Sequence, residues 1–105
     1  MSSSPSTNTS QTIRRAILIM KALKGHSLDG VSNNELAVAL QESPANISRT
    51  LNTLVNEGMV QRLPTGRYAP GMHLLYIAQS FSNEMASGQA RIAELNQRVM
   101  AGSIN

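Results

Sequence analysis

Residues 43–58 read SPANISRTLNTLVNEG, and this stretch decides the fold. Serine is a good N-cap and proline is favoured at the first helical position, so Ser43 and Pro44 predict the start of a helix. Gly58 predicts its end, because a glycine commonly follows the last helical turn. Apolar residues recur between these ends at helical spacing, at Ile47, Leu51, Leu54 and Val55. We therefore expect a helix from Pro44 to Glu57 that buries this stripe.

The opposite face of this helix is polar but not acidic. At 100° per residue it presents Ala45, Asn46, Arg49, Asn52, Thr53 and Asn56. Asparagine can pair with adenine, arginine with guanine, and a small side chain can contact a thymine methyl group. We therefore predict that this face reads bases in double-stranded DNA, with these candidates: Asn46, Ser48, Arg49, Asn52 and Thr53. The alternative is a face that is merely polar and exposed.

A second helix is predicted just before this one. Ser32 and Glu35 have the spacing of a capping box, so the helix should begin near Asn33. Its inward residues are expected to be Leu36, Ala37 and Leu40. Only a few residues around 41–43 join the two helices, and this spacing is typical of a helix-turn-helix.

An earlier helix is predicted over residues 12–24, with Gly25 as its end. Its apolar residues lie on nearly all sides, and such a helix usually has two surfaces to contact. We expect the core face to contain Ile13, Ala16, Ile17, Met20 and Leu23. The opposite side then offers two candidates for contact with a partner chain, Leu18 and Ala22.

The segment after the third helix predicts a wing and further helices. Residues 59–63 and 67–69 should form two short strands around the turn at 64–66, and Val31 could add a short strand. A fourth helix over about residues 72–85 should end before Gly88, and a last short helix should cover residues 90–100. The dimerisation candidates on the fourth helix are Leu74, Ile77, Ala78 and Phe81.

These elements predict a mainly α fold with a small β-hairpin, a winged helix-turn-helix. We expect residues 1–10, rich in Ser, Thr, Pro and Asn, to be a flexible arm. Residues 11–71 would form the DNA-binding domain, and residues 72–105 the linker and dimerisation helices.

A second set of residues could contact the DNA backbone, because wings and helix N-termini commonly lie against phosphates. The candidates are Thr12, Arg14, Arg15, Ser32, Asn33, Ser43, Arg62, Thr65 and Arg67. The alternative interpretation is that the arginines are ordinary solvated surface charges and that Ser32 is occupied as a helix cap.

Composition limits the other functional classes. The chain has 105 residues, a length typical of one domain, and a net charge of +3 that permits nucleic-acid binding. It has no cysteine, which excludes disulfides and thiolate metal sites and fits a cytoplasmic protein. No apolar run reaches the ~20 residues of a membrane span, and the N-terminus lacks the pattern of a signal peptide. His26 and His73 are isolated, so we expect no metal site, no cofactor and no enzymatic activity.

From Ile13 to about Ala78 the sequence resembles the N-terminal DNA-binding domain of IclR-type transcriptional regulators. The segments that carry the resemblance are 13–16 (IRRA), 34–37 (NELA), 48–58 (SRTLNTLVNEG) and 66–71 (GRYAPG). The resemblance implies a homodimer in which the first helix and the helix after the wing contribute to pairing. It also implies that Ser48 and Arg49 lie on the groove-facing part of the third helix.

IclR-type regulators normally carry an effector-binding domain after the linker helix, and this sequence ends at Asn105, where that domain would begin. We therefore expect no small-molecule effector. Two functions remain open: a dimeric, sequence-specific DNA-binding regulator, or a winged-helix module that binds another protein and no DNA.

Overall fold

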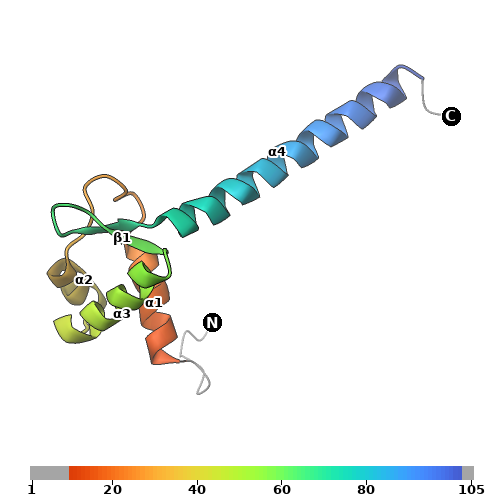
Figure 1. Ribbon diagram of the computed structural model, residues 1–105. Coiled ribbons are helices and arrows are strands. Elements are labelled where there is room, and N and C mark those ends of the chain that lie inside the picture. The colour runs from red at the N-terminus through yellow and green to blue at the C-terminus, as the bar shows by residue number, and fades with distance from the viewer. Residues whose placement is uncertain (1–9, 103–105) are drawn as a thin grey trace. The chain divides into compact units, whose positions relative to one another are not determined.

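The computed structural model describes residues 10–102, so nine residues of the expected N-terminal arm lie outside the described residues. The elements follow in the order α1 (Gln11–Ala22), α2 (Asn33–Leu40), α3 (Pro44–Asn56), β1 (Val60–Arg62), β2 (Tyr68–Pro70) and α4 (Met72–Met100), as Figure 1 shows. The chain divides into two compact units, one up to Leu74 and one from Leu75 onward. The predicted fold class, mainly helical with a two-stranded antiparallel hairpin, is confirmed.

The ends of α2 and α3 are set by local sequence. At the start of α2, Ser32 Oγ accepts from the Glu35 N–H at 3.1 Å, and Glu35 Oε1 accepts from the Ser32 N–H at 2.9 Å. This is the predicted capping box. At the start of α3, Ser43 Oγ accepts from the Asn46 N–H at 3.1 Å, and Pro44 occupies the first turn. Between the two helices, Gln41 has a φ of 56°, which closes the turn in the left-handed region.

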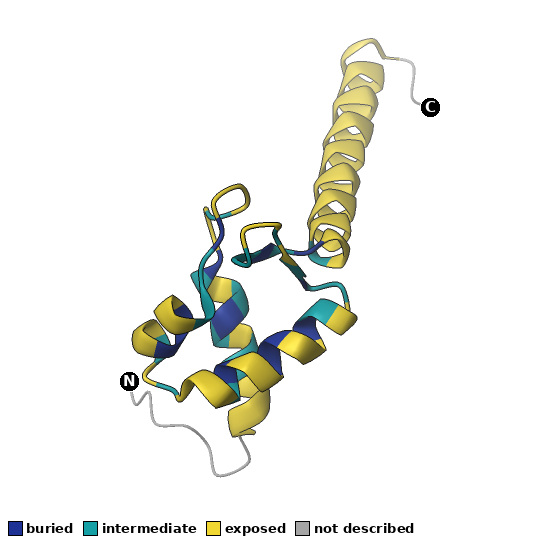
Figure 2. Cartoon of the chain, turned by 60° about the vertical axis from the view of Figure 1, so that its left-hand side comes forward, coloured by how far each residue is buried: buried dark blue, intermediate teal, exposed yellow. Residues whose placement is uncertain are grey.

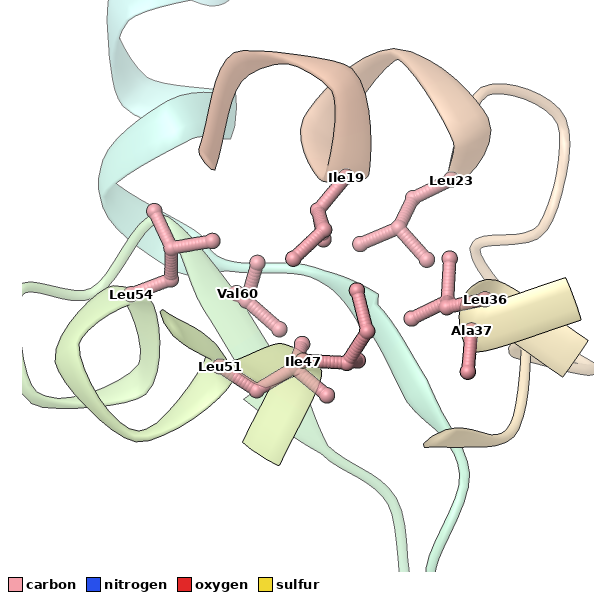
Figure 3. Close-up of a cluster of buried hydrophobic side chains, with 8 residues drawn as sticks. All are labelled: Ile19, Leu23, Leu36, Ala37, Ile47, Leu51, Leu54 and Val60. Atoms are coloured by element: carbon pink, nitrogen blue, oxygen red, sulfur yellow. The ribbon is translucent and has the colours of Figure 1, made fainter. Parts of the chain in front are cut away.

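The hydrophobic core lies where α1, α2, α3 and β1 meet (Figure 3). The buried side chains come from all four elements: Ile19, Leu23, Leu36, Ala37, Ile47, Leu51, Leu54 and Val60. A fully buried Leu, Ile or Val contributes roughly 1.5–3 kcal/mol to stability, so this cluster fixes the mutual position of the three helices. The stripes predicted for α2 and α3 face inward as expected.

The core face of α1 differs from the prediction. The fully buried residues of this helix are Ile19, just inside its end, and the capping Leu23, whereas Ile13 is 62% exposed and Ile17 is 43% exposed. Ala22, expected on the opposite side, packs against the core. The prediction failed because a helix that is apolar on nearly all sides does not mark which side is buried.

The wing is a short antiparallel hairpin with Arg62 opposite Tyr68 and Val60 opposite Pro70. Val31 adds one isolated bridge to Tyr68, in place of the expected strand. The chain then turns back, and Gly71 lies so close to the Gly58 carbonyl that an added Cβ would clash with it. This close approach explains why a glycine stands at the junction of wing and helix.

One continuous helix replaces the two that were expected after the wing. Helix α4 runs from Met72 to Met100 and passes through Gly88 without a break. Glycine costs about 1 kcal/mol relative to alanine inside a helix, and that cost alone does not end a helix whose neighbours on both sides favour it. Figure 2 shows α4 as exposed along almost its whole length. None of the helices in residues 10–102 has the length and apolarity that crossing a membrane requires.

Candidate nucleic-acid interface

The outward face of α3 carries the residues predicted to read bases. Ser48, Arg49, Asn52 and Thr53 are exposed, whereas Asn46 is half-buried. On the inner face, Ile47 and Leu51 are fully buried, so the core fixes the rotation of α3 about its axis. The helix therefore presents a defined polar row to the surface.

A carboxylate that the sequence did not single out holds the first part of this row. Glu42 lies in the turn before α3, and its Oε1 accepts a 3.3 Å hydrogen bond from Asn46 Nδ2. The Asn46 Oδ1 in turn accepts from Arg49 Nη2. The contacts continue one after another from Glu42 to Asn46 to Arg49, which orients both the amide and the guanidinium. Arginine has five N–H donors, so Arg49 keeps enough for a bidentate contact with guanine.

Glu42 also holds Arg15 of α1. The Arg15 Nε lies 3.2 Å from Glu42 Oε1, within ion-pair distance, although its N–H is not aligned for a hydrogen bond. Only 15% of the Arg15 side chain and 28% of the Glu42 side chain are exposed. A partly buried, paired guanidinium is poorly placed to reach a phosphate, so the structure gives this candidate an internal contact.

Asn33 and Ser48 join α2 to α3. Asn33 Oδ1 accepts a 3.0 Å hydrogen bond from Ser48 Oγ, and Asn33 Nδ2 donates to the Pro44 carbonyl at 3.2 Å. These bonds fix the start of α2 beside the start of α3. They also occupy Asn33, which the sequence offered as a phosphate contact.

The hydroxyl groups near the helix starts mostly have structural roles. Ser32 Oγ and Ser43 Oγ accept from backbone N–H groups as helix caps. Thr50, which the sequence did not single out, is buried and donates to the Asn46 carbonyl at 2.8 Å. Thr53 makes a longer 3.4 Å bond to the Arg49 carbonyl and remains exposed. A capping hydroxyl that accepts a hydrogen bond from a backbone N–H can still donate its own proton, so Ser32 and Ser43 keep one donor each.

The two wing arginines, equivalent in the sequence, have different surroundings. Arg67 folds back onto the protein, where Nε donates to the Asp29 carbonyl at 3.1 Å and Nη2 donates to the Gly30 carbonyl at 3.2 Å. Its Nη2 also pairs with Glu35 Oε1 at 2.7 Å. Arg62 is exposed, with its guanidinium carbon 5.9 Å from the centre of the Tyr68 ring. Arg62 is therefore the wing cation that faces solvent.

The contacts of Glu35 with Ser32 and Arg67 affect the pKa of its carboxyl group. The hydrogen bond from the Ser32 backbone lowers the pKa of Glu35 below its usual value, and the nearby Arg67 charge lowers it further. Both interactions favour the ionised carboxylate. The capping box, the wing and Arg67 thus form one connected set of polar contacts at the start of α2.

The first turns of α1 border the outward face of α3. A groove of about 640 Å³ separates the two helices, with Thr12, Ile13 and Ile17 on one side and Arg49 on the other. Arg14 is exposed. Thr12 and Arg14 therefore remain the α1 candidates that solvent can reach. Thr65 of the wing is exposed as well, and its Oγ1 accepts from the backbone N–H two residues on.

Several predicted residues thus come together, and others do not. The base-reading candidates share one face of α3, but Arg15, Asn33 and Arg67 are engaged in contacts inside the protein. Glu42 could have been suspected only from its position in the turn of a helix-turn-helix. Within residues 10–102, no group of three His, Asp or Glu side chains could hold a metal ion. The dimerisation candidates Ile77, Ala78 and Phe81 are exposed on α4, whereas Leu18 and Leu74 are half-buried.

Comparison with known proteins places the chain in a family. The model of the IclR helix-turn-helix domain matches residues 12–64, half of the sequence. Among curated proteins, no sequence matches this chain. An IclR family transcriptional regulator from Brucella abortus has a similar structure, with 16% identity, a TM-score of 0.64 and coverage of 77% of this chain.

That similarity covers 31% of the Brucella regulator, so the present chain spans less than a third of its length. A MepR mutant from a multidrug resistant S. aureus clinical isolate is similar over 98% of this chain and 88% of its own, with 17% identity and a TM-score of 0.56. At these identities the structural matches show the fold alone, and the match to the family model shows the family to which the chain belongs. The chain belongs to the IclR helix-turn-helix family of transcriptional regulators.

Proposed function

We propose that this chain binds double-stranded DNA as a homodimer and regulates transcription, with α3 in the major groove and the hairpin against the backbone. In a helix-turn-helix, the second helix enters the major groove, and a two-fold dimer places two such helices about one turn of DNA apart. The family supports the general function. We infer the major-groove contact, the wing contact and the dimer.

One observation carries the proposal: the outward face of α3 is polar, is uncharged except for Arg49, and is held in position by the core and by Glu42. The core fixes the helix through Ile47 and Leu51, and Glu42 orients Asn46 and Arg49. A side chain already held in place loses less entropy when it binds a base edge.

Sequence-independent affinity has to come from other cations. Arg14, at the start of α1, and Arg62, on the wing, are both exposed and lie in different elements. Contacts from both would fix the register of the protein on the duplex without reading sequence. Because each phosphate contact releases counterions, binding should weaken steeply as salt rises.

The test begins with selection of bound sequences from a random duplex pool, followed by fluorescence anisotropy with the selected duplex and a scrambled one. We expect the selected sites to form a palindrome, as a two-fold dimer requires. Arg49→Ala should reduce the ratio of specific to non-specific affinity by the ~1–3 kcal/mol that one bidentate base contact contributes. Lys24→Ala is the control, because it removes one positive charge from an exposed residue beyond α1.

Two results would contradict the proposal. An unchanged ratio in Arg49→Ala would show that α3 does not read bases in this way. The absence of binding to any duplex, even at low salt, would instead favour a winged-helix module that binds another protein.

A further inference from the structure

Helix α4 carries an apolar stripe that is regular along its length because the helix is continuous. Its members recur alternately every four and three residues: Leu74, Ala78, Phe81, Met85, Gly88, Ile92, Leu95 and Val99. This is the heptad repeat of a coiled coil, with a and d positions alternating along the helix. Phe81, Met85, Ile92 and Val99 are each at least 50% exposed. The stripe is therefore without cover within this chain's described residues.

We propose that α4 pairs with α4 of a second copy as an antiparallel coiled coil centred between Ala86 and Ser87. This inference specifies how the homodimer of the proposed function forms, and it rests on that proposed homodimer. The sizes of the stripe residues and two charges beside it determine the orientation.

Antiparallel pairing matches a large residue with a small one in two of its four distinct layers, and in the other two Phe81 faces the partner's Ile92 and Leu74 faces the partner's Val99. With the centre at 86–87, Met85 faces the partner's Gly88, and Ala78 faces the partner's Leu95. An added Cβ at Gly88 meets nothing within 4 Å in this chain, so the space above it is open to a methionine. A parallel pair would instead set Gly88 against the partner's Gly88 and Phe81 against the partner's Phe81. Alternation of large and small residues across a seam fills the space without voids, so the antiparallel pair packs better.

The charges beside the stripe favour the same orientation. Glu84 and Arg91 both occupy g positions, which flank the seam. In the antiparallel pair, Glu84 lies opposite the partner's Arg91, and symmetry provides this ion pair twice. In a parallel pair, Glu84 would lie opposite the partner's Gln89, and Arg91 opposite the partner's Asn96. Only the antiparallel orientation brings opposite charges together.

The register also sets the distance between the points at which the two α4 helices leave their N-terminal units. In this register Leu74 faces the partner's Val99, so the two Leu74 residues are separated by 25 helical positions, or about 37 Å at 1.5 Å per residue. Leu74 is the last residue of the DNA-binding unit. Successive major grooves are roughly 34–36 Å apart, so the pair would separate the two attachment points by about one turn of DNA.

Single cysteines test the orientation directly, because the natural chain contains none. Full-length Ala78→Cys and Leu95→Cys proteins are oxidised separately and then as a mixture. Antiparallel pairing sets like cysteines about 26 Å apart, whereas a disulfide requires Cα atoms within about 7 Å. We expect a disulfide dimer from the mixture and none from either protein alone. Cross-linking of each protein alone would indicate a parallel pair, and no cross-link at all would indicate that α4 does not pair; both overturn the proposal.

Charge reversal provides a second measurement that leaves the apolar stripe intact. Glu84→Arg should weaken the dimer roughly tenfold in sedimentation equilibrium, because two attractive pairs become repulsive. The double variant Glu84→Arg with Arg91→Glu should restore the wild-type dissociation constant, and a failure to restore it would overturn the register. DNA binding measured on the same proteins separates the two ideas. A chain that binds DNA without cross-linking through α4 refutes this pairing alone, whereas a chain that cross-links but binds no DNA refutes the proposed function alone.

Discussion

The two wing arginines should separate stability from DNA affinity when each is replaced by alanine. Arg67→Ala removes two hydrogen bonds to the carbonyls of Asp29 and Gly30, and each bond contributes about 0.5–1.5 kcal/mol. The ion pair with Glu35 is solvent-exposed, so we count only the carbonyl bonds. The expected loss is about 1–2 kcal/mol, which lowers the melting temperature of a domain of this size by roughly 5–15 °C.

Arg62→Ala is the matched control. Arg62 is exposed and contacts the Tyr68 ring at 5.9 Å, so its removal should change stability by no more than about 0.5 kcal/mol. Its loss should reduce the slope of log affinity against log salt by about 0.9 for each copy that contacts a phosphate. Arg67→Ala should leave this slope unchanged at a temperature where the variant is folded.

Urea denaturation and a salt series of anisotropy titrations measure both quantities. A third variant, Arg67→Lys, should resemble Arg67→Ala, because lysine lacks the planar fork that reaches two carbonyls at once. The reasoning is refuted if Arg67→Ala has the same free energy of unfolding in urea as the wild type, or if Arg62→Ala is the more destabilised of the two.

Three further predictions concern other parts of the DNA-binding unit. Glu42→Ala should lower the free energy of unfolding by about 1–2 kcal/mol in urea denaturation, because it leaves the half-buried Arg15 without its carboxylate. It should also reduce the ratio of specific to non-specific affinity for DNA, and wild-type values for both quantities would contradict the positioning role. The lowered pKa of Glu35 implies stability that is present above the usual pKa of 4.5 and is lost as pH falls through the lower folded value. Glu35→Gln, which keeps a capping box, should therefore lose less stability than the wild type on acidification from about pH 5 to pH 3, and equal losses would exclude this contribution. Gly58→Ala should destabilise the fold by more than about 2 kcal/mol, because φ is +78° there and a Cβ would clash with the His73 ring; a wild-type melting curve would refute the close approach.

The parts of the fold that the sequence predicted are those with local causes. The start of α2 follows from Ser32 and Glu35, three residues apart, and the start of α3 follows from Ser43 and Pro44. The buried stripe of α3 follows from a strong helical period on a helix that is polar elsewhere. In each case the deciding residues lie within one or two turns of one another, so no tertiary information is needed.

The errors in the predicted fold have a common origin in weak local signals. Helix α1 is apolar on nearly all sides, so its sequence does not indicate that Ile19 is buried while Ile13 is exposed. Gly88 was expected to break the last helix, but the cost of one glycine is small beside the propensity of its neighbours. The heptad stripe of α4 becomes visible only once the helix is known to be continuous.

The candidate site was predictable as a face but not as a set of contacts. The polar row on α3 follows from the helical wheel. The role of Glu42 does not, because it depends on Arg15, 27 residues earlier, packing beside the turn. Likewise, nothing near Arg62 or Arg67 in the sequence distinguishes the cation that faces solvent from the one that holds the start of α2.

Under the proposed function, the distribution of positive charge favours binding as a dimer. In the part of the DNA-binding unit that the structure describes, Arg15 and Arg67 are paired with carboxylates. The cations exposed there are Arg14, Lys21, Lys24, Arg49 and Arg62. They are spread over α1, the segment after it, α3 and the wing, so we expect one copy to direct only some of them toward a duplex. Each phosphate contact contributes about 0.9 to the salt slope. Two copies on one operator double the contacts, and their linkage makes the second set intramolecular. With so few exposed cations per copy, we expect the proposed affinity for DNA to be far higher when two copies bind one operator.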